Sequence, residues 1–168
     1  MIETHRLLLH PLNYQQLEKY ISADNSLERE LNLNDSSRTI SPELKDALEQ
    51  TILPNVADPT KNYLYCTLWT MILKDGNTMV GDICIVGEPN ERGEIEIGYG
   101  TYNEHWGQGY MTEAVGGILR WVATQPEVLW VYASTEPTNT ASFRILQKNG
   151  FEKLAETDQL ISWRIKVK

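Results

Sequence analysis

The chain has only two cysteines among its 168 residues, Cys66 and Cys84, and they do not form a C-x-x-C pair. A disulfide framework and a cysteine metal site are therefore unsupported, and we expect two buried, reduced thiols in strand-like segments. Histidine is also scarce, since three occur and none has a second ligand at the spacing that a metal site requires. We therefore expect no metal cofactor.

Long apolar runs and basic residues are missing as well. No segment approaches the ~20 apolar residues of a membrane-spanning helix, and residues 7–9 are too short for the hydrophobic part of a signal peptide. We expect a soluble, cytoplasmic protein without a membrane partner. Lys and Arg number 15 against 23 Asp and Glu, which gives a formal net charge of −8. Because nucleic-acid binding calls for a basic face, this charge argues against a nucleic-acid partner and favours cationic molecules such as amines.

Length and pattern indicate one mixed α/β domain over residues 1–168, without repeats or linkers. Residues 24–38 are polar and aperiodic. Because a helix separates the strand patterns at 94–101 and 128–134, we expect these two strands to be parallel. The periodicities and turn residues predict, in order, a strand at 2–9, helices at 13–23 and 41–54, strands at 63–73, 79–86 and 94–101, a helix at 113–123, a strand at 128–134, a helix at 141–148, and a hairpin at 151–156 and 160–167.

The most informative stretch is the junction at residues 99–114, where a strand pattern ends, Gly107 and Gly109 follow, and a helix pattern begins. The first N–H groups of a helix lack intrahelical partners and lie at the positive end of its dipole, so the junction favours anions. Glycine lets a phosphate approach the amides closely, although glycines also serve turns that simply need positive φ. The dinucleotide fingerprint G-x-G-x-x-G and the P-loop pattern are absent. The pattern therefore predicts a diphosphate site of another kind.

The run Trp106-Gly-Gln-Gly-Tyr-Met-Thr-Glu-Ala114 resembles the pyrophosphate loop of the GNAT superfamily of N-acetyltransferases, in its RimJ/RimL-like branch. In the family pattern Q/R-x-x-G-x-G/A, Gly109 matches the fourth position, whereas Trp106 and Met111 depart at the first and sixth. The resemblance implies a central mixed sheet of about seven strands with about four helices, and acetyl-CoA as the acyl donor. The implied cofactor-binding residues are Tyr99, Gly100, Thr101, Trp106, Gly107, Gln108, Gly109, Tyr110, Met111, Thr112, Asn139 and Ser142.

A second run, Asn139 to Phe151, is similar to the family segment N-x-x-[AS]…G-F on the helix after the fifth strand. Asparagine at a helix start is commonly a cap, and the resemblance adds a contact with the pantetheine arm. Ser142 lies one turn later, near the cofactor sulfur in the resembling family. Leu146 holds the place where many members have a tyrosine general acid, so we expect Ser142 to serve as the acid. A thiolate of pKa about 8.5 can also leave unprotonated.

A primary amine is mostly protonated at neutral pH, so its attack on a thioester needs a proton acceptor. Glu96 shares one strand face with Glu94 and Gly98. Because it lies nearer the glycine loop than Glu94, it is the candidate general base, directly or through water. The plain alternative is that both glutamates line a solvated face. Glu113 lies in the first turns of a helix, where a carboxylate usually complements the dipole. Backbone N–H groups at residues 99–101 are candidate donors to the thioester carbonyl if this strand separates from its neighbour.

Together these features predict acetyl transfer from acetyl-CoA to a primary amine, of a protein or peptide N-terminus or of a small molecule. The amine is expected to attack directly in a ternary complex, with no covalent enzyme intermediate, because neither cysteine has a partner base. The alternative is a non-catalytic CoA-binding sensor or interaction module. Residues 24–62 should shape the acceptor pocket but bear no interpretable motif, and a homodimer is left open.

Overall fold

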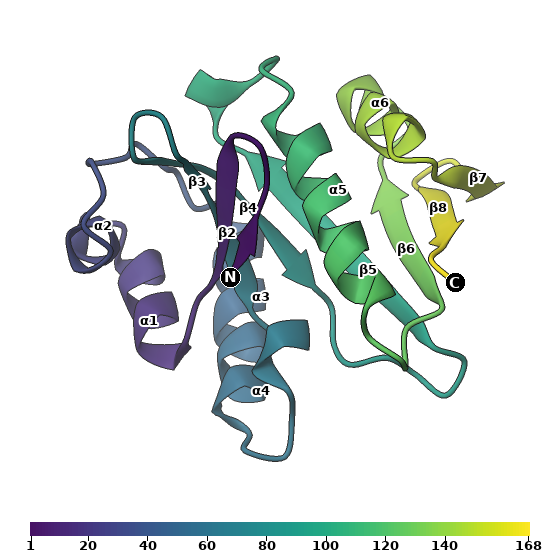
Figure 1. The fold of residues 1–168 in the computed structure, drawn as a ribbon, viewed down its shortest axis with the longest axis horizontal. Coiled ribbons are helices and arrows are strands. Elements are labelled where there is room, and N and C mark those ends of the chain that lie inside the picture. The colour runs from purple at the N-terminus through teal and green to yellow at the C-terminus, as the bar shows by residue number, and fades with distance from the viewer.

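The computed structural model describes all residues 1–168 as one mixed sheet of eight strands in the order β1-β2-β3-β4-β5-β6-β8-β7 (Figure 1). Only β5 and β6 run parallel, as the strand-helix-strand pattern predicts, and all other neighbours are antiparallel. The strands are β1 (Ile2–Glu3), β2 (Leu7–Pro11), β3 (Leu68–Leu73), β4 (Thr78–Ile85), β5 (Glu94–Thr101), β6 (Trp130–Thr135), β7 (Glu152–Glu156) and β8 (Ile161–Lys166).

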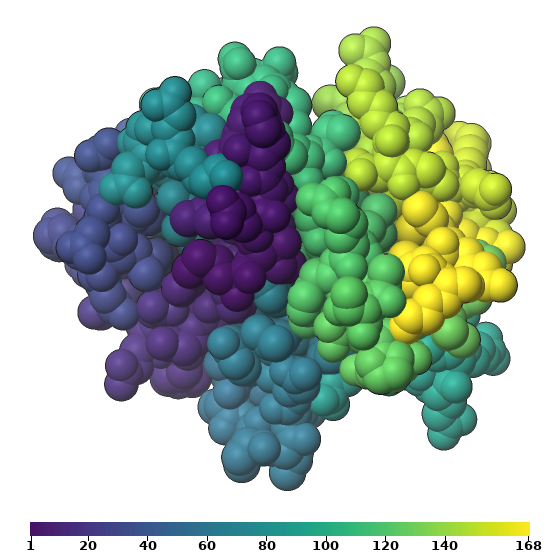
Figure 2. All heavy atoms as spheres, viewed as in Figure 1, coloured from purple at the N-terminus to yellow at the C-terminus, as the bar shows by residue number.

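Helices cover both faces of the sheet. On one face α5 (Tyr110–Ala123) and α6 (Thr140–Lys148) pack over the larger apolar cluster, and α5 lies beside the N-terminal hairpin, green against purple in Figure 2. On the other face α1 (Tyr14–Ser22), α2 (Ser26–Glu30), α3 (Pro42–Ala47) and α4 (Leu53–Ala57) surround a smaller cluster. β3 shows the division, because Trp69 and Met71 belong to the first cluster while Leu68 and Ile72 belong to the second.

The opening strand expected at residues 2–9 is wrong, because the chain turns between β1 and β2 to form a hairpin. The Thr4 amide donates to Leu7 O at 2.9 Å, and the Leu7 amide donates to Thr4 Oγ1 at 3.1 Å. A threonine hydroxyl that satisfies a backbone amide stabilises such a turn. This hairpin accounts for eight strands where about seven were expected.

The helix expected to stop at Pro54 continues to Ala57 instead. Between α3 and α4 the chain forms a π-helical turn at Leu48–Ile52, and Pro54 then occupies the first turn of α4. Proline is tolerated inside this continuous helix because the wide turn before it shifts the hydrogen-bond pattern. The aperiodic residues 24–38 include α2, which at five residues is too short to show a period.

The strand expected at residues 63–73 begins only at Leu68. Tyr63–Tyr65 forms a 3-10 turn, because the Asn62 side chain accepts a hydrogen bond from the Leu64 amide at 3.2 Å. Cys66 therefore lies outside a strand, whereas Cys84 is on β4, and both cysteines are free. No helix has the length and apolar character needed to cross a bilayer.

Candidate functional site

The parallel strands β5 and β6 separate near the middle of the sheet. Their pairing covers Glu94 to Ile97 on β5 and ends there, although β5 continues to Thr101 along its other neighbour, β4. The β6-facing edge of Gly98 to Thr101 therefore lacks a strand partner. Apart from Thr101 O, which accepts from the Trp106 indole, backbone groups on this edge are free to bond an extended ligand, or to donate to an oxygen that gains charge.

Beside this edge, the glycine loop leads into α5. Gly107 and Gly109 have φ of +72° and +79°, in the left-handed region that glycine adopts without strain. Gly109 is the N-cap residue and supplies no side chain to bond the first amides of α5, so these amides are open to a ligand. The sequence prediction of an anion-binding helix start thus has the required local geometry.

One cavity of about 630 Å³ lies between this loop, the end of β5 and the start of α6. It brings together all the residues to which the sequence assigned cofactor binding, from both runs of the chain. They are Tyr99, Gly100, Thr101, Trp106, Gly107, Gln108, Gly109, Tyr110, Met111, Thr112, Asn139 and Ser142.

The same cavity is lined by residues that sequence reasoning did not assign to it, among them His105, Arg144, Ile145 and Lys148. The signal that identifies two of them is helical spacing, since Ile145 and Lys148 lie three and six residues after Ser142 on α6. Arg144 and Lys148 bring positive charge to the rim of the cavity, in a chain whose net charge is −8. An anionic ligand would be attracted there.

Two side chains of the loop depart from the family pattern without filling the cavity. Met111 is 3% exposed and belongs to the larger core cluster, so its side chain points into the protein interior. Trp106 is 64% exposed, and its indole Nε1 donates to Thr101 O at 2.8 Å. The tryptophan therefore ties the loop to the end of β5.

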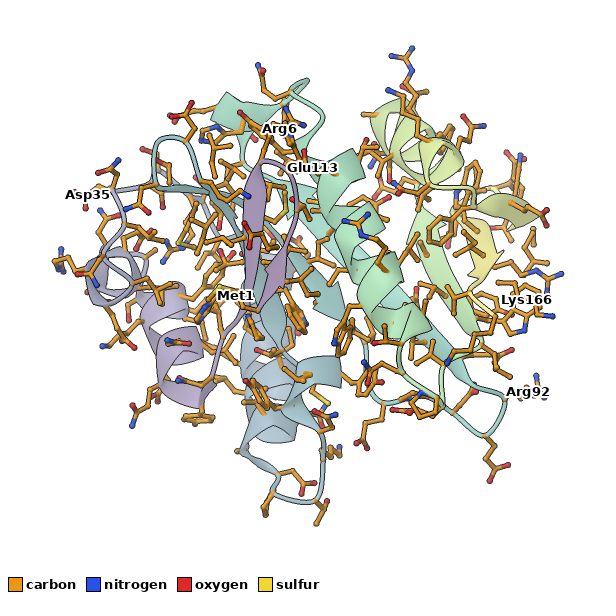
Figure 3. All side chains as sticks on the ribbon, in the orientation of Figure 1. Met1, Arg6, Asp35, Arg92, Glu113 and Lys166 are labelled. Carbon is orange, nitrogen blue, oxygen red and sulfur yellow. The ribbon has the colours of Figure 1, made fainter.

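A clamp from the N-terminal hairpin holds the loop from the other side. The Arg6 side chain donates from Nε to Glu113 Oε2 at 2.7 Å and from Nη1 to Gln108 O at 2.9 Å (Figure 3). Its guanidinium lies 4.7 Å from the ring centroid of Tyr110. Glu113 therefore anchors the loop through Arg6 and does not line the cavity, a more specific role than complementing the helix dipole.

Glu113 is held strongly ionised by its partners. Burial favours its neutral form, but hydrogen bonds from the Thr4 hydroxyl and the Arg6 amide, with the charge of the Arg6 side chain, outweigh burial and lower its pKa to about 2. Both the hydroxyl and the amide donate to Oε1 at 2.6 Å. Such a carboxylate is not a proton acceptor at neutral pH.

At the inner end of the cavity, two hydroxyls meet. Tyr99 OH lies 2.6 Å from Ser142 Oγ, and Ser142 is 6% exposed. Asn139 caps α6 as predicted, since its Oδ1 accepts from the Ser142 amide at 3.1 Å. Burial raises the pKa of Tyr99, although the bond to Ser142 opposes this, so the phenol stays protonated. Leu146 is fully buried in the core and has no hydroxyl. The hydroxyls of the cavity wall come instead from Tyr99 on β5 and Ser142 on α6.

A second cavity of about 620 Å³ lies on the opposite face of the sheet. It shares Tyr99, Gly100 and Thr101 with the first cavity, so the two meet at the end of β5. The segment at residues 24–62 contributes to its wall, in agreement with the expectation that this segment shapes a pocket. The remaining lining residues are Tyr20, Ser37, Thr39, Leu44, Leu68, Asp82, Cys84, Gly98, Tyr102, Asn103 and Glu104.

Glu96 lies on the β5 face that carries the second cavity, but it does not line either one. It is exposed, and its Oε1 accepts from Ser134 Oγ at 3.1 Å. Glu94 is engaged elsewhere, because Asn90 and Tyr132 donate to its carboxylate and lower its pKa.

No three His, Cys, Asp or Glu side chains gather in a way that could hold a metal ion. The site instead offers free backbone amides, a pair of hydrogen-bonded hydroxyls and two cavities that share residues at the end of β5. They suit the binding of a long anionic ligand on one face and of a second molecule on the other.

Comparison with known proteins gives a consistent result. Residues 6–152 match the family model of the acetyltransferase (GNAT) domain. The chain is 27% identical over 154 residues to the uncharacterised N-acetyltransferase YjdG of Bacillus subtilis (strain 168), covering 90% of this chain and 89% of that protein.

Solved structures share the fold. A RimL ribosomal L7/L12 α-N-protein acetyltransferase in complex with coenzyme A superposes with a TM-score of 0.65 at 16% identity, over 97% of this chain and 95% of the other. A point mutant of the spermidine N-acetyltransferase SpeG of Vibrio cholerae superposes with a TM-score of 0.67 at 16% identity, over 96% of this chain and 94% of the other.

Proposed function

The chain belongs to the acetyltransferase (GNAT) family, in its RimL-like branch, and from this premise we propose that it transfers acetyl from acetyl-CoA to a primary amine. GNAT acetyltransferases use acetyl-CoA as the donor. The acceptor class is the α-amine of a protein or peptide, or the amine of a small molecule. Because acetyl-CoA is the donor, we also keep the cytoplasm as the proposed location.

The observation that supports this proposal best is the meeting of the two cavities at the end of β5. The diphosphate of CoA binds the free amides at the start of α5, and the pantetheine arm lies along the unpaired edge of Gly98 to Thr101. Arg144 and Lys148 are placed to contact a further phosphate of the cofactor. The thioester then points toward the second cavity, where the acceptor binds.

The reaction follows from this placement. The neutral amine attacks the thioester carbonyl, a C–N bond forms, and the oxygen gains charge that the β5 amides stabilise. The C–S bond then breaks, and the departing sulfur takes a proton with the help of Ser142 Oγ, which is paired with Tyr99 OH. Glu96 is our proposed final proton acceptor, reached through water because it is exposed. No covalent intermediate with the enzyme forms.

The test is a thiol-release assay with acetyl-CoA and a panel of amines. The acceptors named for structural neighbours guide the panel, so it contains a peptide with a free α-amine, spermidine and an aminoglycoside. We expect thiol release that requires one of these amines, and a matching mass increase of that amine. Tight CoA binding without acceptor-dependent thiol release from any amine would support the non-catalytic binding module instead.

A further inference from the structure

Asp82 is a buried carboxylate on β4 that lines the second cavity. It is 7% exposed, and two tyrosine hydroxyls donate to its Oδ2, Tyr20 OH at 2.6 Å and Tyr102 OH at 2.9 Å. The other oxygen, Oδ1, is buried and has no hydrogen-bond partner. Across the β3–β4 ladder Asp82 faces Thr70, whose buried hydroxyl is also unpaired and is a neutral donor that lowers the pKa of the carboxyl. Buried carboxylates are normally paired with a cation, so what this arrangement lacks is a cationic partner.

No cation of the protein pairs with Asp82. The nearest positive side chain, Arg38, forms a buried ion pair with Glu28 and donates from Nη2 to Tyr20 O at 3.0 Å. Its charge acts on Asp82 from a distance and lowers the pKa of that carboxyl, without a hydrogen bond between the two side chains. A cavity that presents a buried carboxylate without a cationic partner is suited to a cationic ligand, because such a ligand restores the missing charge and donor.

Asp82 lies beside the stretch of β5 where we propose that the thioester binds. Its partner across the β4–β5 ladder is Gly100, in the stretch of β5 that lines both cavities. A side chain at Gly100 would meet no atom within 4 Å, so the space on that face is open. A cation held at Asp82 therefore lies beside the backbone along which the thioester is proposed to bind.

We propose that Asp82 binds the ammonium group of the acceptor and takes its first proton, an inference that rests on the proposed function. An N–H bond breaks and an O–H bond forms, which leaves a neutral amine and a neutral carboxylic acid. The amine then attacks and a C–N bond forms; as the C–S bond breaks, the nitrogen loses its second proton to water, and the departing sulfur gains one proton through the Ser142 hydroxyl, so that the proton on Asp82 is the one released per turnover. Asp82 returns its proton to water, on the way to Glu96 and bulk solvent, before the next cycle.

Burial favours this proton transfer because it raises the pKa of a carboxyl and lowers the pKa of an ammonium group, so both charged forms are disfavoured. Burial raises the pKa of Asp82 to about 6, against the opposing effects of the Tyr20 and Tyr102 hydroxyls, the Arg38 charge and Thr70 on β3. The two tyrosines stay neutral donors, since burial and the nearby carboxylate raise their pKa values.

The remaining ionisable groups of this cavity do not replace Asp82. Burial raises the pKa of Cys84 to about 11, so its thiol is neutral. Glu104 lines the outer wall and is exposed, which adds negative potential for a cation. The acceptor class is therefore a cationic primary amine without a carboxylate of its own beside the reacting nitrogen.

The decisive variant is Asp82→Asn, which keeps the shape of the side chain but cannot bind a cation or accept a proton in the same way. With the best amine of the panel at pH 7, we expect kcat/KM to fall about 10³-fold, within the range for loss of a general base. The loss should shrink as pH rises toward ~10, where the amine itself is neutral. Affinity for CoA, measured by calorimetry, should stay within about twofold, since the cofactor cavity excludes Asp82.

Tyr20→Phe and Tyr102→Phe are the matched controls, because each removes a donor and keeps the carboxylate. They should lower kcat/KM less than Asp82→Asn, and the pH profile should keep its shape but move toward higher pH, because each hydroxyl lowers the pKa of Asp82. If Asp82→Asn does not fold, Gly100→Val tests the same space. It should raise KM for the amine at least tenfold and more than it raises KM for acetyl-CoA, which is measured beside it because Gly100 lines both cavities. A folded Asp82→Asn protein with kcat/KM near wild type overturns the inference and leaves the proposed function intact. An inactive wild-type protein overturns the proposed function itself.

Discussion

The hydroxyls of Tyr99 and Ser142 lie 2.6 Å apart, although 43 residues separate them in the chain. Tyr99 comes from the end of β5, where the two cavities meet, and Ser142 comes from the first turn of α6. Position 146 on α6, where many members of the family have a tyrosine, is a leucine here, but Tyr99 supplies a phenol from β5. This pair supplies the hydroxyl chemistry proposed for the leaving sulfur.

The first prediction concerns this pair. Ser142→Ala should lower kcat about tenfold or more, because the thiolate loses its proton donor. The loss should shrink above pH about 8.5, where a thiolate leaves without a proton. Tyr99→Phe should have a smaller effect, and the double variant should be no worse than Ser142→Ala alone if both hydroxyls act as one unit. Additive losses in steady-state kinetics would instead assign them independent roles.

The second prediction concerns the phosphate-binding loop. Gly109→Asp should weaken CoA binding at least tenfold, because it adds a side chain at φ +79° and a negative charge beside the proposed diphosphate. Gly76→Asp is the control, since Gly76 has φ +106° in a turn far from the loop along the chain, and its added side chain meets no atom within 4 Å. Calorimetry should give unchanged CoA affinity for the control. Equal affinity in both variants would place the cofactor elsewhere.

The third prediction concerns Glu96. Glu96→Gln should keep CoA affinity and lower kcat about 10²-fold at neutral pH, with the loss shrinking as pH rises. Glu94→Gln is the matched control on the same strand face, because its carboxylate already accepts from Asn90 and Tyr132. It should leave kcat within about twofold of wild type. Unchanged turnover in Glu96→Gln would remove this residue from the proton path.

The sequence predicted well the part of the fold formed by β5 and the start of α6. The bounds of β5 and the capped start of α6 were predicted from strong local signals, namely strict alternation and an asparagine cap. All the predicted cofactor residues line one cavity because they lie in two short runs, one across the junction of β5 and α5 and the other at the start of α6. Local patterns are sufficient where neighbours in the chain are also neighbours in space.

The parts that the sequence missed depend on contacts between distant segments. The β1–β2 turn is stabilised by Glu113, which lies more than 100 residues later, and no local period reveals such a bond. In the sequence Asp82 is an ordinary polar residue of a strand, and only the fold shows that the Tyr20 and Tyr102 hydroxyls donate to it. Tertiary contacts of this kind override local propensity, so the cavity around Asp82, where we propose that the acceptor binds, could be found only from the structure.

The last prediction concerns the pH dependence of stability through Glu113. Because the pKa of this carboxyl is lowered to about 2 in the folded protein, its contribution to stability is complete above the unfolded pKa of about 4.5 and is lost as pH falls toward 2. Glu113→Gln removes the ion pair with Arg6 and should destabilise the protein by about 2 kcal/mol at pH 7. Urea titrations should show that the difference between variant and wild type narrows between pH 5 and about 2. The same variant should weaken CoA binding, because Arg6 no longer holds Gln108 O in place. A constant difference across this pH range would mean that Glu113 acts by packing alone, and unchanged CoA affinity would show that the loop keeps its shape without the clamp.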